Sequence, residues 1–351
     1  MDTKATGALS PKSSSRREIS FRGFAGEADL PLVLRLVRES DAADGKSEQA
    51  SVEEIADFCA PSARFDPRRD LVIALVDEAS EGPKAVGLSK LGWYSDFAGS
   101  RLFWQVSLLT KEGRTLGLWP LILRDNERRL RALSSGEPSS GQSFYQAWSN
   151  DAERDWIATL ESEGYEVVRQ FHNMRHPLTA IAEMALPEGL EIRPVVEGDF
   201  RRVWEAQKAL NESVFENVAE QWAEERYPAW AQAASGNAGL WQVAWAGEEL
   251  AGMVLARFGA EEEAQAGSKR GFTEHIYVAP KWRKRGLAGA LTTRALRALK
   301  ALGALEAELG VDAANESAAY RLYGKLGYKT VSVDTWYRKA VPGDEAPPAG
   351  T

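Results

Sequence analysis

The sequence has too few metal-binding and disulfide-forming side chains for a covalent or metal framework. Its 351 residues include one cysteine, Cys59, and three histidines. A single cysteine cannot form an internal disulfide, and so small a set of ligands does not build a zinc site. We therefore expect no metal.

Long hydrophobic runs are also missing. Stretches such as Leu71 to Val76 are far shorter than the ~20 apolar residues that cross a bilayer. The start methionine is not followed by the apolar segment of a secretion signal. We expect a soluble, cytoplasmic protein without a membrane partner.

Positive charge is in deficit. The 43 Lys and Arg residues face 51 Asp and Glu residues, which gives a net charge of −8. This is the wrong sign for a protein whose main partner is a polyanion, so we expect no nucleic-acid partner. Hydrophobic residues at 44% and charged residues at 27% are typical of a globular chain, and the length favours two domains.

Two successive segments carry the same order of elements, β-α-α-β-β-β-α-β-α-β-β. The first has expected strands at 19–24, 70–76, 84–93, 101–109, 143–148 and from 165 to 180, and helices at 28–40, 51–60, 115–133 and 151–163. The second has expected strands at 190–194, 239–246, 249–258, 271–278, 305–311 and 328–339, and helices at 197–211, 284–302 and 316–326, with broken helix to 234.

Matching landmarks support a duplication of one mixed α/β domain. Gly117 and Gly286 lie 169 residues apart, and the pairs Gly164-Tyr165 and Gly327-Tyr328 lie 163 apart. Residues 183–189, punctuated by proline and glycine, form the expected linker between a domain at 18–182 and a domain at 190–340. Residues 1–17 and 341–351 have the composition of disordered tails.

The most informative segment predicts a strand, a tight loop and a long helix. A β-rich run ends at Val278, a turn follows, and the loop reads Arg283-Lys284-Arg285-Gly286-Leu287-Ala288 before the helix. Amides at a helix start lack intrahelical partners and lie at the positive end of the helix dipole, so they bind phosphate groups. Four cations in five positions, Lys281 and Arg283 to Arg285, favour a phosphate-bearing cofactor over an ordinary basic surface patch.

A second pattern follows, in which Asn315 is a natural N-cap. Ala319, Leu322, Tyr323 and Leu326 form a helical stripe that ends at Gly327. Together with Arg283, Gly286 and Ala288 in an R/Q-x-x-G-x-G/A pattern, these residues make the chain similar to the GCN5-related N-acetyltransferase (GNAT) superfamily. The duplication resembles the tandem members of that superfamily.

The resemblance implies a tandem GNAT fold, each unit with a mostly antiparallel central sheet flanked by helices, and acetyl-coenzyme A as acyl donor. It implies that backbone amides at Arg285 to Ala288 hold the pyrophosphate and that the pantetheine arm lies beside Ile276 to Val278. The cofactor-binding residues so implied are Ile276, Tyr277, Val278, Arg283, Lys284, Arg285, Gly286, Leu287, Ala288 and Asn315.

Tyr323 is the candidate general acid, because a phenol of pKa ~10 donates to a thiolate whose conjugate acid has a pKa of ~8.5 when hydrogen bonding positions it. Its alternative role is that of a core residue on the helix stripe. Glu274 is the candidate base, because strand alternation places it on the face of Ile276 and Val278 with His275 opposite. A register error of one residue exchanges Glu274 and His275, and Glu274 has the alternative role of an ordinary strand carboxylate.

The acceptor side carries less information. Glu212, Glu216, Glu220 and Glu224 recur every four residues among Phe215, Trp222 and Trp230. An acidic mouth flanked by aromatic rings suits a cationic amine, whereas the alternative is a solvated helix face.

The first half lacks the equivalent chemistry. Arg114 aligns with Arg283, but Trp119 aligns with Ala288, Gln105 with Glu274 and Leu160 with Tyr323. We therefore predict one catalytic domain, in the second half, and a degenerate first domain that shapes the substrate site.

The predicted function is N-acetyl transfer from acetyl-coenzyme A to a primary amine of a small molecule, directly in a ternary complex. The alternatives are a non-catalytic acyl-coenzyme A sensor or assembly module and an acetyltransferase for protein lysines or N-termini. The sequence leaves open the acceptor, the acyl-chain length and whether the protein is a monomer or a homodimer.

Overall fold

The computed structural model describes residues 18–46, 50–62, 64–78, 82–95, 100–133, 142–214, 222, 224–259, 269–313 and 316–342. In the first half the strands are β1 (Ile19–Gly23), β2 (Leu71–Glu78), β3 (Gly82–Ser95), β4 (Arg101–Leu109), β5 (Ser143–Asn150) and β6 (Glu166–His176). Its helices are α1 (Leu30–Ala43), α2 (Val52–Phe58), α3 (Pro67–Asp70), α4 (Lys111–Thr115), α5 (Trp119–Leu133) and α6 (Arg154–Ser162).

The second half repeats the order of strands and most of the helices. Its strands are β7 (Glu191–Ile192), β8 (Gln242–Ala246), β9 (Glu249–Arg257), β10 (Arg270–Val278), β11 (Glu306–Asp312) and β12 (Lys329–Ala340). Its helices are α7 (Phe200–Val214), α8 (Tyr227–Ser235), α10 (Leu287–Ala301) and α11 (Arg321–Leu326).

Two expected helices are interrupted where the backbone leaves the α conformation. The helix expected at 115–133 begins only at Trp119 as α5, because the chain turns at Gly117, which has a φ of +68°, after α4 has ended at Thr115. The helix expected at 316–326 begins as a π-helical turn, Glu316–Tyr320, before α11. The expected strand groups at 165–180 and 328–339 are the single long strands β6 and β12.

One continuous sheet runs through the described residues, in the order β1-β2-β3-β4-β5-β12-β6-β11-β10-β9-β8-β7. Only β4 with β5 and β10 with β11 pair in parallel, and each parallel pair covers the first part of its strands. The tandem, mostly antiparallel α/β fold predicted from the sequence is confirmed.

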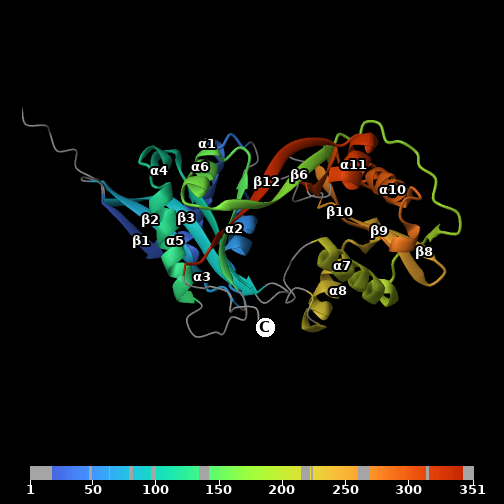
Figure 1. The fold of residues 1–351 in the computed structure, drawn as a ribbon, viewed down its shortest axis with the longest axis horizontal. Coiled ribbons are helices and arrows are strands. Elements are labelled where there is room, and N and C mark those ends of the chain that lie inside the picture. Colours follow the sequence, from blue (N-terminus) through green and yellow to red (C-terminus); the bar gives the residue numbers. More distant parts are fainter. Residues whose placement is uncertain are drawn as a thin grey trace, which may run out of the picture.

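The two halves exchange their last strands across the middle of this sheet. Strand β6 of the first half pairs with β11, whereas β12 of the second half pairs with β5. The two exchanged strands also pair with each other and form the connection visible between the two groups of helices (Figure 1). Asp334 joins three strands, because it accepts hydrogen bonds from Asn150 at 2.8 Å and Asn173 at 2.7 Å.

The exchange places side chains of each half in the core of the other. Tyr337 and Val341 are buried in the core beneath α5 and α6, and Met174 and Leu178 are buried with α10 and α11. Burial of one such side chain contributes roughly 1.5–3 kcal/mol. The two halves are therefore coupled in stability, and the proposed linker at 183–189 divides the sequence without dividing the sheet.

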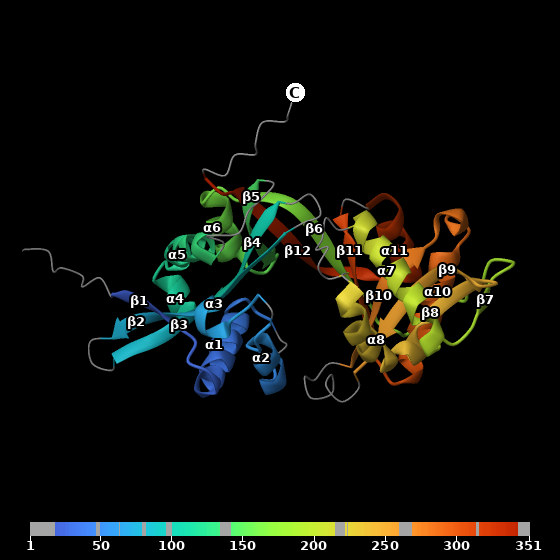
Figure 2. The ribbon, with the colours of Figure 1, turned by 90° about the horizontal axis from the view of Figure 1, so that it is seen from below.

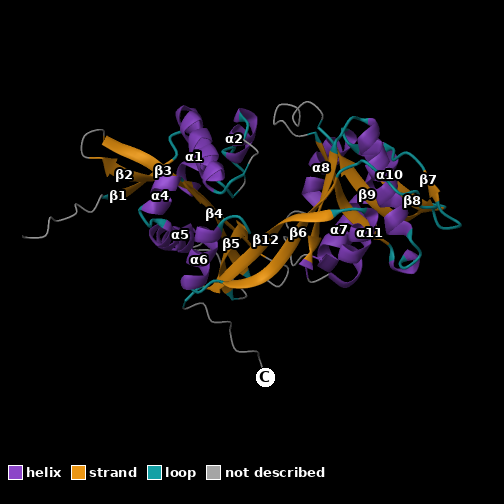
Figure 3. Ribbon diagram, turned by 90° about the horizontal axis from the view of Figure 1, so that it is seen from above, coloured by secondary structure: helices purple, strands orange, loops and turns teal. Residues whose placement is uncertain are grey.

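Helices cover both faces of the sheet in each half. In the first half, α1 and α2 pack on one face and α5 and α6 on the other (Figure 2). In the second half, α7 and α8 cover one face and α10 and α11 the other. Strands β5, β12 and β6 continue the sheet between the two groups of helices (Figure 3). No helix among the described residues is long and apolar enough to cross a membrane.

Candidate active site

A β-bulge in β10 sets the geometry of the site. Glu274 pairs with Leu255 and Tyr277 pairs with Met253, so two residues of β10 oppose one of β9. His275, within the bulge, has a φ of +47°. Because side chains alternate along a strand, the extra residue reverses the faces of all residues that follow it.

The bulge overturns the face predicted for Glu274. Ile276 and Val278 pack on the α10 side, where Thr273 bonds to Tyr328 at 2.8 Å. Glu274 therefore lies on the opposite face, and its carboxylate meets the Arg257 guanidinium at 3.4 Å. The expectation that it shares a face with Ile276 and Val278 is wrong, because regular alternation does not hold across a bulge.

The loop after β10 presents open backbone. A turn at Pro280–Trp282 leads to two residues in the left-handed region, Lys284 with φ +60° and Gly286 with φ +83°. Helix α10 begins at Leu287, and nothing lies within 4 Å of where a Cβ on Gly286 would be. Left-handed residues beside a helix start turn successive amides toward one concave side, which is the geometry of an anion site.

The four cations of the loop have different surroundings. Lys281 forms an ion pair with Glu249, and Arg283 donates from Nε to the Val278 carbonyl at 3.1 Å. The Arg285 guanidinium lies 4.9 Å from the centre of the Trp282 ring. Lys284 and Arg285 are exposed.

A cavity of about 690 Å³ opens between this loop, β10 and α11. Its lining is mostly apolar and consists of Leu210, Ile276, Tyr277, Val278, Trp282, Arg283, Lys284, Gly286, Leu287, Ala288, Gly289, Ala318, Ala319, Leu322 and Tyr323. Segments far apart in the sequence therefore meet at one site. Nearly all the residues predicted from the cofactor pattern are in this lining; Arg285 and Glu274 are not.

Tyr323 lies at the wall of the cavity and is 7% exposed. Burial raises the pKa of its phenol well above the ordinary value, so the hydroxyl stays protonated at neutral pH. Its ring lies 6.0 Å from that of Tyr328, at a steep angle. Asn315, the predicted N-cap and thioester neighbour, lies outside the described residues.

Sequence reasoning missed several lining residues. Trp282 and Gly289 flank the predicted loop, Leu210 comes from α7, and Leu322 is on the recognised stripe. An aromatic residue inside a cationic loop was a usable signal for Trp282. Leu210 had none, because its approach depends on how α7 packs.

The predicted acidic mouth is described only in part. Glu224 is exposed and bonds to Arg201 at 2.8 Å, whereas Trp222 is buried against Trp204 with ring centres 4.6 Å apart. Trp222 therefore belongs to the core, and Glu216 and Glu220 lie outside the described residues.

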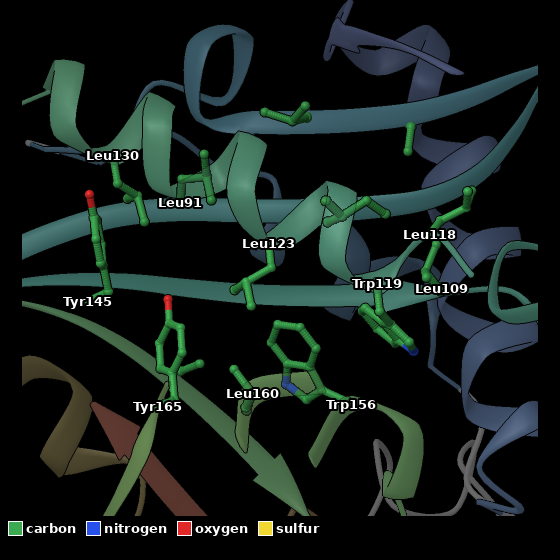
Figure 4. Close-up of a cluster of buried hydrophobic side chains, with 14 of the residues drawn as sticks. Leu91, Leu109, Leu118, Trp119, Leu123, Leu130, Tyr145, Trp156, Leu160 and Tyr165 are labelled. Carbon is green, nitrogen blue, oxygen red and sulfur yellow. The ribbon is translucent and has the colours of Figure 1, made fainter. Parts of the chain in front are cut away.

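The first half has bulky, buried side chains at the positions aligned with two cavity residues, although its backbone at Gly117 is as open as that at Gly286. Trp119 and Trp156, which align with the cavity residues Ala288 and Ala319, are buried with ring centres 4.7 Å apart (Figure 4). Arg114 donates from Nε to the Leu109 carbonyl at 3.0 Å, as Arg283 does to Val278, but its other nitrogens bind the buried Asp44 at 2.7 Å or less.

Comparison with known proteins agrees with this geometry. The sequence model described as "Acetyltransferase (GNAT) family" matches residues 203–328. A mycothiol acetyltransferase of Streptomyces scabiei is 30% identical over 235 residues, which cover 64% of this chain and 66%, just under two thirds, of that protein.

Two solved structures share the fold along nearly the whole chain. A GCN5-related N-acetyltransferase from Sphaerobacter thermophilus has a TM-score of 0.74 at 23% identity and covers 94% of this chain and 98% of its own. A tandem GNAT protein from the clavulanic acid biosynthesis pathway has a TM-score of 0.61 at 14% identity, with coverages of 95% and 100%.

Proposed function

We propose that this chain, which belongs to the GNAT superfamily, transfers an acetyl group from acetyl-coenzyme A to a primary amine of a small molecule, directly in a ternary complex. The observation that carries the proposal is the open backbone at Gly286, at the edge of a mostly apolar cavity. Such a site suits a ligand with a phosphorylated head and a thin, largely apolar arm.

The loop and the bulged strand divide the binding of the donor. Amides at Arg285 to Ala288 would hold the pyrophosphate, and Ile276 to Val278 would flank the pantetheine arm. The bound donor supplies an acetyl group already activated as a thioester. The bulge interrupts the regular ladder with β9 at His275 and Ile276. A backbone amide at this position would polarise the acetyl carbonyl.

Tyr323 is the proposed general acid. Its buried hydroxyl is held in the protonated form, ready to donate. Burial makes the phenol a weaker acid, but the same apolar surroundings raise the pKa of a thiol formed in the cavity, so the two shifts offset each other.

Glu274 is the proposed base, on the α7–α8 face of β10 and opposite the face of Tyr323. An amine approaching from that face meets the carboxylate while the thiolate leaves on the other side of the strand. His275 is the competing base, because burial lowers the pKa of its imidazole and keeps it neutral. Separate Glu274→Gln and His275→Gln variants distinguish the two: loss of the acidic limb of the pH profile of kcat/KM, where the base becomes protonated, identifies the base.

The test is to incubate a cell extract, which holds both small molecules and proteins, with labelled acetyl-coenzyme A and the protein, and to search for labelled products by mass spectrometry. We expect a labelled amide that requires the protein and is absent with Gly286→Trp. Label only in proteins or peptides would support the lysine or N-terminal activity instead. Donor binding without any labelled product, in the extract and in a broad amine panel, would support a sensor.

A further inference from the structure

The cationic loop contains an aromatic residue that the phosphate site does not by itself require. Trp282 lines the cavity, and the Arg285 guanidinium lies 4.9 Å from its ring centre. We propose that Trp282 is a positioning residue that holds Arg285 for contact with the phosphate groups of the donor. This inference rests on the proposed function, since it assigns a role within the same site.

Stacking suits this role because of the shape of the guanidinium group. An arginine on an indole contacts the ring with its flat face, so the N–H groups at its edge remain able to donate to a phosphate. A guanidinium group that is paired with a carboxylate has already used its N–H donors. Arg114, which forms an ion pair with Asp44, shows that alternative in the first half.

The segment that joins the two halves passes close to the indole. Atom Cη2 of Trp282 is the nearest atom, at 3.9 Å, to where a Cβ on Gly189 would be. Gly189 has a φ of +81°, in the turn before β7. The same segment is tied to α10, because Arg297 donates to the Ala182 carbonyl at 2.9 Å and Lys300 to the Thr179 carbonyl at 3.2 Å.

Met184 extends this contact to the first turn of α10. Its sulfur lies 2.7 Å from where a Cβ on Gly289 would be, so the segment closely covers the helix beside the loop. Trp282 is thus placed between a fixed segment and Arg285. A long, flexible side chain positioned in advance loses less conformational entropy when it binds its ligand.

The test is calorimetric titration of the full-length protein with coenzyme A and with phosphate-free pantetheine. For Trp282→Leu we expect coenzyme A affinity to fall roughly 2- to 5-fold, the range of a cation–π contact at an exposed site, with pantetheine affinity unchanged. Arg285→Gln is expected to do the same, and the double variant to lose no more than the larger single loss. Trp282→Phe, which keeps a ring, is expected to lose less and guards against misfolding of the leucine variant.

Several outcomes overturn the proposal. Unchanged coenzyme A affinity in Trp282→Leu and Trp282→Phe, or additive losses in the double variant, would show that Trp282 does not act through Arg285. Equal losses for coenzyme A and pantetheine would make it a plain wall of the cavity. If the unmodified protein binds no coenzyme A, the proposed function fails as well; if it binds and the variants match it, only this inference fails.

Discussion

In both halves of the chain an arginine follows the central strand and bonds to its last carbonyl, but the surroundings of the two arginines differ. Arg114 and Arg283 each donate to the carbonyl at the end of the preceding strand, and Gly117 and Gly286 are both left-handed. In the first half the guanidinium also binds a buried carboxylate, and two tryptophans stack where the second half has two alanines. The scaffold is therefore shared, and we propose that side-chain volume and charge leave room for a donor only in the second half.

The central strands of the two halves differ in the same sense. Strand β4 pairs with β3 in unbroken register from Arg101 to Leu109, whereas β10 carries the bulge at His275. Gln105 is 1% exposed and faces α5: its amide nitrogen donates to the Tyr165 hydroxyl at 3.0 Å and its oxygen accepts from Asn126 at 2.9 Å. Its structural counterpart is Thr273, which bonds to Tyr328, because the bulge moves Glu274 out of the alignment predicted from the sequence.

The largest effect is expected when the second half receives the tryptophan that the first half has at the aligned position. We expect Ala288→Trp to lower acetyl-coenzyme A affinity at least about 1000-fold, ~4 kcal/mol, because the indole fills the donor cavity. Calorimetric titration measures it, with Ala301→Trp at the exposed end of the same helix as control. Binding that survives Ala288→Trp would mean that the donor lies elsewhere.

The next contrast is Tyr323 against Leu160. Tyr323→Phe is expected to lower kcat about 100-fold while acetyl-coenzyme A affinity stays within about twofold, since only the proton donor is removed. Steady-state rates with the identified acceptor and titration of the donor measure the two effects. Tyr328→Phe, which loses the bond to Thr273, serves as the control and should reduce stability more than turnover. An unchanged kcat in Tyr323→Phe would remove Tyr323 as the acid.

The ion pair of the first half is expected to matter for stability and not for chemistry. Side chains Arg114 and Asp44 are 12% and 4% exposed, so Asp44→Ala leaves a buried charge uncompensated and should cost about 3 kcal/mol in the free energy of unfolding. Chemical denaturation measures this, with the exposed pair Arg35–Glu39 as control through Glu39→Ala. Donor affinity should not change; a loss of affinity would give the first half a direct part in donor binding.

The smallest effect concerns the exchanged strand β6. His176 is 1% exposed and accepts a hydrogen bond from the Leu178 amide at 3.0 Å. Burial lowers the pKa of its imidazole, and a hydrogen bond to the Leu326 backbone offsets part of that lowering. The unfolded chain binds a proton that the folded chain resists, so stability is complete above pH ~6.5 and falls as the pH drops toward the lowered folded value. Denaturation at pH 7.5 and 5.5 should show a smaller drop for His176→Gln than for His172→Gln.

Part of that dependence should remain in His176→Gln, since burial of His275 acts in the same direction. An identical pH dependence in His176→Gln and the unaltered protein would contradict the account of this residue.

Sequence patterns predicted those features of the structure that depend on residues close together in the chain. The duplication, the order of the elements, the loop around Gly286 before a long helix and most of the cavity lining follow from spacing and residue type. The exchange of β6 and β12 did not follow, because either strand has the same composition and alternation whichever neighbour it pairs with. The face of Glu274 was missed because a bulge inserts one residue without a signal in this sequence.

Long-range packing accounts for the rest. The sequence alignment of the halves placed Trp119 against Ala288 but gave no indication that Trp156 would stack on it, since the two come from different helices. Leu210 reaches the cavity from α7 for the same kind of reason.

The most direct measurement is the number of acetyl-coenzyme A molecules that the full-length protein binds, by isothermal titration calorimetry. We expect one bound acetyl-coenzyme A molecule per chain, with binding retained in Trp119→Ala and lost in Gly286→Trp. Two sites per chain, or one that persists in Gly286→Trp, would contradict the assignment of the donor to the second half.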